Sequence, residues 1–231
     1  MSERSSDVLE KQIIQAILEG EFKQDEPLLP ERELAAHFQV GRPAVREVLQ
    51  RLERDGWITQ RKGMPSIVRN YKRNGNLLTI VRMVQMYDRI PDNFIQHMLE
   101  VRISLTPAYI KDAVLHHPLS VISLFSNLDE LENDPLSYAM FDWGLQRNLA
   151  ALSPNPVYLF ILNTFNDVYL KMGETYFQEK THRQLSLNFY QDLLDSLLRN
   201  DLGQIELITQ NMMTASVALW KEKTRRENGE I

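Results

Sequence analysis

Apolar residues recur every three to four positions in the first third of the chain, the spacing of a helix with one buried face. A first helix is predicted from about Asp7 to Gly20. A second apolar set has the same spacing with an interruption at residues 39–41, and comprises Leu34, Phe38, Val45, Val48, Leu49 and Leu52. Pro43 suits the first turn of the helix after that interruption, because its missing N–H would have no intrahelical partner there. Two short strands around 57–59 and 66–68 complete the pattern of a winged helix-turn-helix.

The spacing is also helical from residue 77 almost to the C-terminus, with prolines at the boundaries. The predicted helices are Leu77–Tyr87, Asp92–Leu115, Leu119–Leu131, Pro135–Leu152, Pro156–Phe177, His182–Arg199 and Asp201–Arg226. We therefore expect a mainly α protein, with an N-terminal winged helix-turn-helix and a C-terminal all-α ligand-binding helical bundle. The predicted domains are residues 1–72 for DNA binding, a linker at 73–78 and an effector-binding domain at 79–231.

Basic residues concentrate in one segment of an otherwise acidic chain. Residues 42–73 contain nine Lys or Arg against three Asp or Glu, whereas the whole chain carries a net charge of −5. Arg42, Arg46 and Gln50 fall on the side of their helix opposite the apolar set, where arginines can reach guanine edges and phosphates from the major groove. Each arginine taken alone could simply belong to a solvated face. The local excess as a whole indicates a DNA-binding module.

The composition argues against several other classes. The chain has no cysteine, which suits a reducing compartment, and its polar first seven residues do not form a signal peptide. No apolar run approaches the roughly 20 residues of a membrane span. We expect a cytoplasmic protein that does not enter a membrane.

The basic segment resembles the DNA-binding domain of GntR-type bacterial transcription regulators, and within them the FadR subfamily. The likeness lies in the run from Arg46 to Leu52 and in Arg54-Asp55-Gly56-Trp57. It implies operator contacts from the first helix of the motif, the recognition helix and the tip of the wing: Arg32, Arg42, Pro43, Ala44, Arg46, Lys62 and Gly63. The subfamily has hydroxyl residues where this chain has Gly41, Pro43 and Ala44, so the direct base hydrogen bonds from those positions are lost. The resemblance also implies a homodimer on a palindromic operator.

The C-terminal half is similar to the ligand domain of the same subfamily, over residues 141–150, 153–158 and 215–220. Many GntR relatives bind a divalent metal there through an aspartate and three histidines. The corresponding residues here are Asp142, Gln146, Tyr190 and Met212, and only the aspartate matches. An amide, a phenol and a thioether are poor ligands for zinc, nickel or manganese. We expect no metal and no other cofactor.

The subfamily resemblance implies long-chain acyl-CoA as the effector. It assigns effector contacts to Arg102, Ser216 and Trp220, and we add Asp142, Tyr190 and Met213 to the predicted set. Arginine can pair with phosphate, serine can bond the pantetheine or thioester, and tryptophan offers an apolar wall. Met213 stands where the subfamily has a glycine, so its side chain could narrow the cavity. The alternative for Met213 and Trp220 is a plain role in the core.

These residues predict a regulator of fatty-acid metabolism that long-chain acyl-CoA releases from double-stranded operator DNA. One alternative is a GntR-type regulator that responds to a small organic acid, with Arg102 binding the carboxylate. A second alternative is an enzyme acting on acyl thioesters. We do not expect an enzyme, because the chain has no cysteine and no Gly-x-Ser-x-Gly motif.

Overall fold

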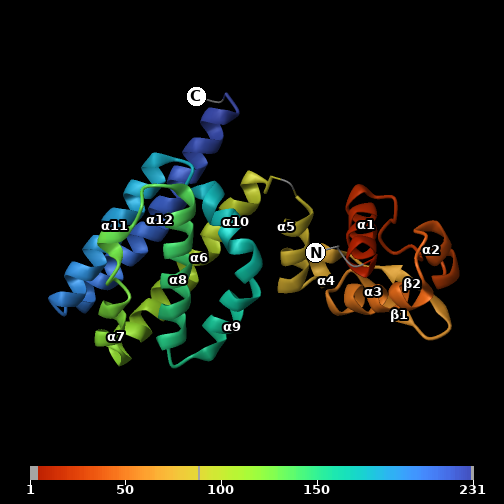
Figure 1. Cartoon of the computed structure of the whole chain (residues 1–231), viewed down its shortest axis with the longest axis horizontal. Helices are drawn as coiled ribbons and strands as arrows, with labels where there is room; N and C mark the ends of the chain where they lie inside the picture. Colours follow the sequence, from red (N-terminus) through yellow and green to blue (C-terminus); the bar gives the residue numbers. More distant parts are fainter. Residues whose placement is uncertain (1–4, 88, 230–231) are drawn as a thin grey trace. The chain divides into compact units, whose positions relative to one another are not determined.

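The computed structural model describes residues 5–87 and 89–229, apart from the side chain of Asp167 (Figure 1). The chain divides into two compact units, Met1–Asp88 and Arg89–Ile231. Each unit has its own core. Among the described residues, no helix combines the length and the hydropathy needed to cross a membrane.

The N-terminal unit is the predicted winged helix-turn-helix. Its elements are α1 (Ser5–Glu19), α2 (Glu31–His37), α3 (Arg42–Arg54), β1 (Ile58–Arg61) and β2 (Met64–Val68). The strands pair antiparallel, with Ile58 opposite Val68 and Arg61 opposite Met64. Between them, Gly63 has a φ of +73°, a left-handed conformation that glycine adopts without a steric penalty. Both strands begin one or two residues away from the predicted positions.

The core of this unit is the apolar set that the periodicity predicts. Leu34, Val45, Val48 and Leu52 are completely buried, together with residues of α1 and β1. Trp57 is buried among them and lies 5.2 Å from the ring of Tyr71, centroid to centroid. The polar faces of α2 and α3 are therefore left at the surface.

Two further helices, α4 (Tyr71–Asn74) and α5 (Leu77–Met86), belong to the same unit. Asn76 caps α5 and also donates from Nδ2 to the Arg54 carbonyl oxygen at 2.9 Å. Thr79 Oγ1 donates to the Asp55 carbonyl oxygen, and Arg82 pairs with the buried Glu10 at 3.1 Å. The predicted division places residues 73–78 in a linker, whereas these contacts, with the packing of Met83 and Met86 on the core, attach residues up to Met86 to the N-terminal unit.

At Gly56, just after the end of α3, the backbone of Asn74 and Gly75 comes close to the chain. Gly56 has a φ of +83°, and a Cβ placed on it would lie 2.9 Å from Gly75 Cα and closer still to the Asn74 carbonyl oxygen. Gly56 is therefore required both for its left-handed backbone and for the close approach of the following chain.

The C-terminal unit is an all-helical bundle, as predicted (Figure 1). Its elements are α6 (Asp92–His116), α7 (Pro118–Ser123), the 3₁₀ helix η1 (Leu128–Glu130), α8 (Pro135–Leu152), α9 (Pro156–Thr164), α10 (Asn166–Tyr176), α11 (Lys180–Leu198) and α12 (Leu202–Glu227). The long α6 packs against α12 on one side and α8 on another, while α10 packs on α8 and α11 on α12.

Two predicted helices are each divided in the structure. The helix predicted over Leu119–Leu131 ends at Ser123, and only η1 follows it. Ser123 Oγ bonds the Ser120 carbonyl oxygen, one of the local side-chain bonds by which serine competes with helix continuation. The helix predicted over Pro156–Phe177 is interrupted at Phe165, whose φ and ψ of −95° and 5° leave the helical region.

Candidate functional site

The predicted DNA contacts lie on the exposed face of the helix-turn-helix and its wing. Arg32 on α2 and Arg42, Pro43 and Arg46 on α3 are exposed, and Ala44 is half-buried. The first turn of α3 has no side-chain cap and Pro43 has no N–H, so the backbone N–H groups of Arg42 and Ala44 are open to an anion such as a phosphate. Lys62 and Gly63 are exposed at the turn between the strands.

Arg46 is held in place by the helix before it. Its Nε donates to Glu31 Oε2 at 2.8 Å, while 66% of the Arg46 side chain stays exposed. The pair fixes the direction of the guanidinium without burying it. Arg46 therefore has the accessibility that a base or phosphate contact needs.

Not every basic residue of the segment faces outward. Arg51 donates to Asp7 at 2.8 Å and to the buried Glu10 at 3.0 Å, and the first of these bonds is the main reason why its pKa is raised. Arg54 pairs with the buried Asp55 at 2.6 Å. Arg51, whose side chain is 22% exposed, therefore stabilises the unit rather than adding to the DNA-binding surface that the charge count suggests, whereas 56% of the Arg54 side chain stays exposed.

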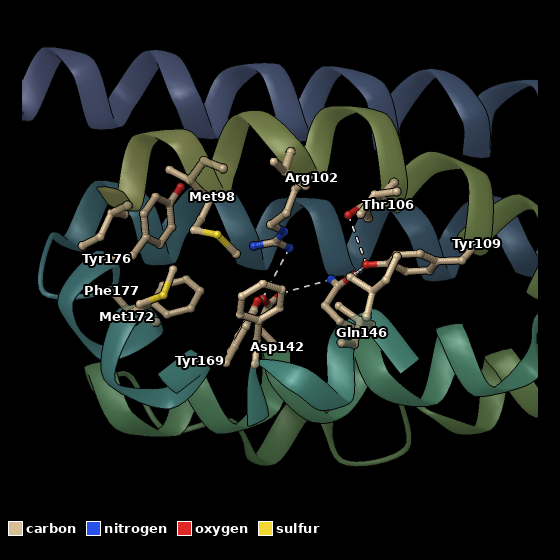
Figure 2. Close-up of a pocket in the computed structure, with 18 residues that line it drawn as sticks. Met98, Arg102, Thr106, Tyr109, Asp142, Gln146, Tyr169, Met172, Tyr176 and Phe177 are labelled. Carbon is tan, nitrogen blue, oxygen red and sulfur yellow. Dashed lines mark hydrogen bonds and ion pairs between the residues drawn. The ribbon is translucent and has the colours of Figure 1, made fainter. Parts of the chain in front are cut away.

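A cavity of about 70 Å³ lies in the C-terminal unit between α6, α8, α9 and α10. Its described lining residues are mainly apolar: Ile95, Met98, Leu99, Val101, Leu105, Ile161, Leu162, Phe165, Met172 and Phe177, with polar groups from Arg102, Thr106, Tyr109, Asp142, Gln146, Tyr169 and Tyr176. Figure 2 shows Met98, Met172, Tyr176 and Phe177 at one end, and Thr106, Tyr109 and Gln146 at the other. An apolar pocket with a few convergent polar groups is the usual form of a ligand site.

Asp142 is the centre of a polar network between the two ends of the pocket (Figure 2). Its Oδ2 pairs with Arg102 Nη2 at 3.4 Å and accepts a hydrogen bond from the Tyr169 hydroxyl. Its Oδ1 accepts from Tyr190 at 3.0 Å and from Gln146 Nε2 at 3.2 Å. Four side chains from four helices thus converge on one carboxylate.

A second chain of hydrogen bonds extends from Gln146 to the far end of the pocket. Tyr109 donates to Gln146 Oε1 at 2.5 Å, and Thr106 Oγ1 lies 3.1 Å from the Tyr109 hydroxyl oxygen. Because Tyr109 uses its proton on Gln146, Thr106 is the donor in that pair. The network therefore fixes the orientation of each polar group in it.

Burial keeps these hydroxyl groups protonated. It raises the pKa of Tyr109 to about 12 and the pKa values of Tyr169 and Tyr190 well above their ordinary value, and the Asp142 charge adds to the rise in both of the latter. Burial opposes the charge on Arg102, but the Tyr169 and Asp142 groups beside it raise its pKa above the ordinary value. At neutral pH the site is an arginine–carboxylate pair surrounded by neutral donors.

The predicted effector residues fall into two groups, those that line the pocket and those that are buried behind its lining. Arg102 and Asp142 line the pocket, and Tyr190 lies directly behind Asp142. Ser216 and Trp220 are buried on α12 and are not among the lining residues: Ser216 Oγ donates to the Met212 carbonyl oxygen at 2.9 Å and Trp220 Nε1 to that of Asp92 at 2.9 Å. Met213 is also buried outside the lining.

Tyr176 connects the lining of the pocket with the residues behind it. It lines the pocket, and its ring stacks on Trp220 with 5.9 Å between the centroids. Burial raises the pKa of Tyr176 to about 12, and the neighbouring Ser216 hydroxyl partly opposes that rise. The prediction omitted Tyr109, Tyr169 and Tyr176. An aromatic residue at helical spacing indicates a core position, and nothing in the sequence distinguishes a core tyrosine whose hydroxyl reaches a pocket.

The residues at the metal position of GntR relatives do not fit a metal ion. Both Asp142 oxygens already accept from Arg102, Tyr169, Tyr190 and Gln146. No group of three His, Asp or Glu side chains able to hold a metal occurs in the described part of the chain. The arginine supplies the positive charge at this place in the bundle.

Comparison with known proteins gives matches along nearly the whole described chain. Residues 5–68 match the model of the bacterial regulatory proteins of the gntR family, and residues 70–228 match that of the FadR C-terminal domain. The chain is 34% identical over 215 residues to the fatty acid metabolism regulator protein of Shewanella pealeana, covering 92% of this chain and 89% of that protein. It is 32% identical over 212 residues to the protein of the same name from Haemophilus influenzae, covering 92% and 88%.

A solved structure shows the same fold. It is that of Lar, described as controlling expression of the Listeria monocytogenes agr system, with a TM-score of 0.64 and 15% identity over 96% of this chain and 99% of that one. At this identity the likeness concerns the fold alone.

Proposed function

We propose, from the premise that this chain belongs to the GntR family of bacterial regulatory proteins and carries a FadR C-terminal domain, that long-chain acyl-CoA is the effector that releases it from its operator. The coarser function follows from the family and the relatives: the chain is a DNA-binding transcription regulator of fatty-acid metabolism, and it is not an enzyme. The identity of the effector is the proposed part.

The lining of the pocket is the observation that supports this effector. Ten apolar side chains surround a single ion pair, and methionines at one end, Met98 and Met172, can adapt to a flexible chain. A long acyl group would occupy the apolar part, and its entry would move the lining helices apart, because the cavity of about 70 Å³ is smaller than a ligand pocket of roughly 300–1,000 Å³. Its carbonyl oxygen would accept a hydrogen bond from Arg102 or from the Tyr176 hydroxyl, since Tyr109 and Tyr169 already donate to Gln146 and Asp142, and the CoA group would remain toward solvent.

On the DNA side, we infer that α3 enters the major groove and that Arg42 and Arg46 contact base edges or phosphates. Lys62 and Gly63 would lie along the adjacent minor groove, where a glycine at the wing tip lets the backbone approach closely. A homodimer would present two such surfaces to a palindrome. Acyl-CoA would favour a conformation of lower operator affinity, and operator DNA would weaken acyl-CoA binding by the same factor.

Calorimetric titration with oleoyl-CoA tests the proposal, with free CoA and citrate as controls. We expect binding of oleoyl-CoA alone, and loss of the operator complex in a gel-shift assay at saturating oleoyl-CoA. An operator complex that survives saturation would overturn acyl-CoA as the releasing effector. Citrate binding with release of DNA would establish the organic-acid alternative instead.

A further inference from the structure

The charged groups of the pocket are already paired with each other. Arg102 and Asp142 are the two lining residues, among those described, that carry a full charge at neutral pH, and their side chains lie 3.4 Å apart. All other lining groups are apolar or neutral. The interior of the pocket therefore has no net charge, and it has no cation left to bind an anion.

Asp142 is the fixed member of this pair. Its side chain is 6% exposed and is held by Tyr169, Tyr190 and Gln146, whereas the Arg102 side chain is 22% exposed. A ligand that enters the pocket thus meets the guanidinium with the carboxylate immediately behind it. Moving Asp142 away would leave three buried donors without their acceptor, which is unfavourable.

The consequence depends on the charge of the ligand's carboxyl group. A free carboxylate that approaches Arg102 must share the guanidinium with Asp142, and two carboxylates in a poorly solvated site repel each other. An esterified carboxyl group carries no charge, and its carbonyl oxygen needs only one donor. The ion pair therefore discriminates against free acids and leaves neutral acyl groups unaffected.

We propose that Asp142 is a specificity-determining residue: by neutralising Arg102 it excludes free fatty acids and other carboxylates from the pocket and admits acyl chains whose carboxyl group is a thioester or ester. This inference rests on the proposed function, because it requires that acyl chains enter this pocket. It assigns Asp142 to the selection of the ligand's chemical class, in the place where metal-binding relatives use an aspartate to hold the ion.

Asp142→Asn is the direct test. Asparagine keeps the shape and one acceptor oxygen and removes the charge, so Arg102 becomes free to bind a carboxylate. Its NH2 group replaces an oxygen that accepts from buried donors, so some loss of stability is expected as well. We expect the affinity for oleate, measured by calorimetry below its micelle concentration, to rise on the order of tenfold to hundredfold. This is the size of the repulsion between two partly screened carboxylates that share one guanidinium. The affinity for methyl oleate should change much less.

Tyr190→Phe is the matched control, since it removes one donor to Asp142 and keeps the carboxylate. Its affinity for oleate should not rise. Circular dichroism checks that both variants are folded. If Asp142→Asn does not fold, the wild-type protein still provides a test: it should bind methyl oleate at least about tenfold more tightly than oleate, because only the acid meets the like charge.

The outcomes separate this inference from the proposed function. Wild-type protein that binds oleoyl-CoA but takes oleate equally well would overturn the role of Asp142 and leave the proposed effector standing. An Asp142→Asn variant that is folded and gains no affinity for oleate would overturn it as well. A wild-type protein that binds neither oleoyl-CoA nor methyl oleate would overturn both.

Discussion

Replacement of Gly56 by alanine tests the attachment of α5 to the DNA-binding unit. Gly56 and Gly63 both have left-handed backbones, with φ of +83° and +73°. A Cβ at Gly63 would meet nothing within 4 Å, whereas a Cβ at Gly56 would overlap the backbone of Asn74 and Gly75. The Gly63→Ala variant is therefore a matched control, because both substitutions restrict the unfolded chain equally.

The expected losses of stability differ in size. Alanine in a left-handed conformation costs about 1–2 kcal/mol, and this is the whole effect expected at Gly63. At Gly56 the overlap with backbone atoms adds about 1–3 kcal/mol, the usual effect of overpacking. The atoms in contact are a carbonyl group and a Cα, which cannot rotate aside as a side chain can. We expect Gly56→Ala to destabilise the N-terminal unit by about 2–5 kcal/mol.

Hydrogen exchange of the full chain measures the difference in stability between the two variants for the N-terminal unit separately. The buried positions of α3, such as Val45, Val48 and Leu49, exchange through unfolding of the whole N-terminal unit and report on both variants alike. Equal losses of protection in Gly56→Ala and Gly63→Ala would refute the argument. They would mean that the chain after the wing does not lie against Gly56.

Three further predictions concern other parts of the chain. Arg46→Ala should weaken operator binding by about 1–3 kcal/mol and reduce its salt dependence, measured by fluorescence anisotropy at several salt concentrations; unchanged affinity would exclude Arg46 from the interface. Burial lowers the pKa of His182 below 6.5, so only the unfolded chain takes up this proton as the pH falls below that value. The melting temperature should then fall between pH 6.5 and 5.5, and less so in His182→Gln; identical pH profiles would contradict this origin. Trp220→Phe should destabilise the C-terminal unit by at least about 1 kcal/mol in urea denaturation, because the Asp92 carbonyl oxygen loses its donor and the smaller ring leaves a cavity at a completely buried position; an unchanged stability would contradict both effects.

The fold could be predicted from local signals where those signals are strong. Pro118, Pro135 and Pro156 each stand in the first turn of a helix, which is where the sequence places helix boundaries. The interruption at Phe165 has no such signal, since neither proline nor glycine is adjacent. Phe165 leaves the helical conformation where its side chain lines the pocket, and the Thr164 hydroxyl before it bonds the Phe160 carbonyl oxygen at 2.9 Å, a bond that threonine also makes inside continuous helices.

The candidate site was predictable only in part, for a related reason. Family resemblance identifies Arg102 and Asp142, and the structure brings them together. It also identifies Ser216 and Trp220, which lie behind the lining, where Trp220 supports Tyr176. Whether a residue lines a cavity or supports one that does is decided by the positions of neighbouring helices, and a single sequence contains no local pattern for this.

The bonds that join α5 to the N-terminal unit determine how this regulator can be recombined with others. Asn76 and Thr79 bond the carbonyl oxygens at the end of α3, and Arg82 reaches the buried Glu10. A hybrid protein that joins this DNA-binding unit to a foreign effector domain at residue 72 would discard these partners and leave Glu10 without Arg82. The transferable module ends after Met86, and a hybrid built at that junction keeps the whole set of contacts.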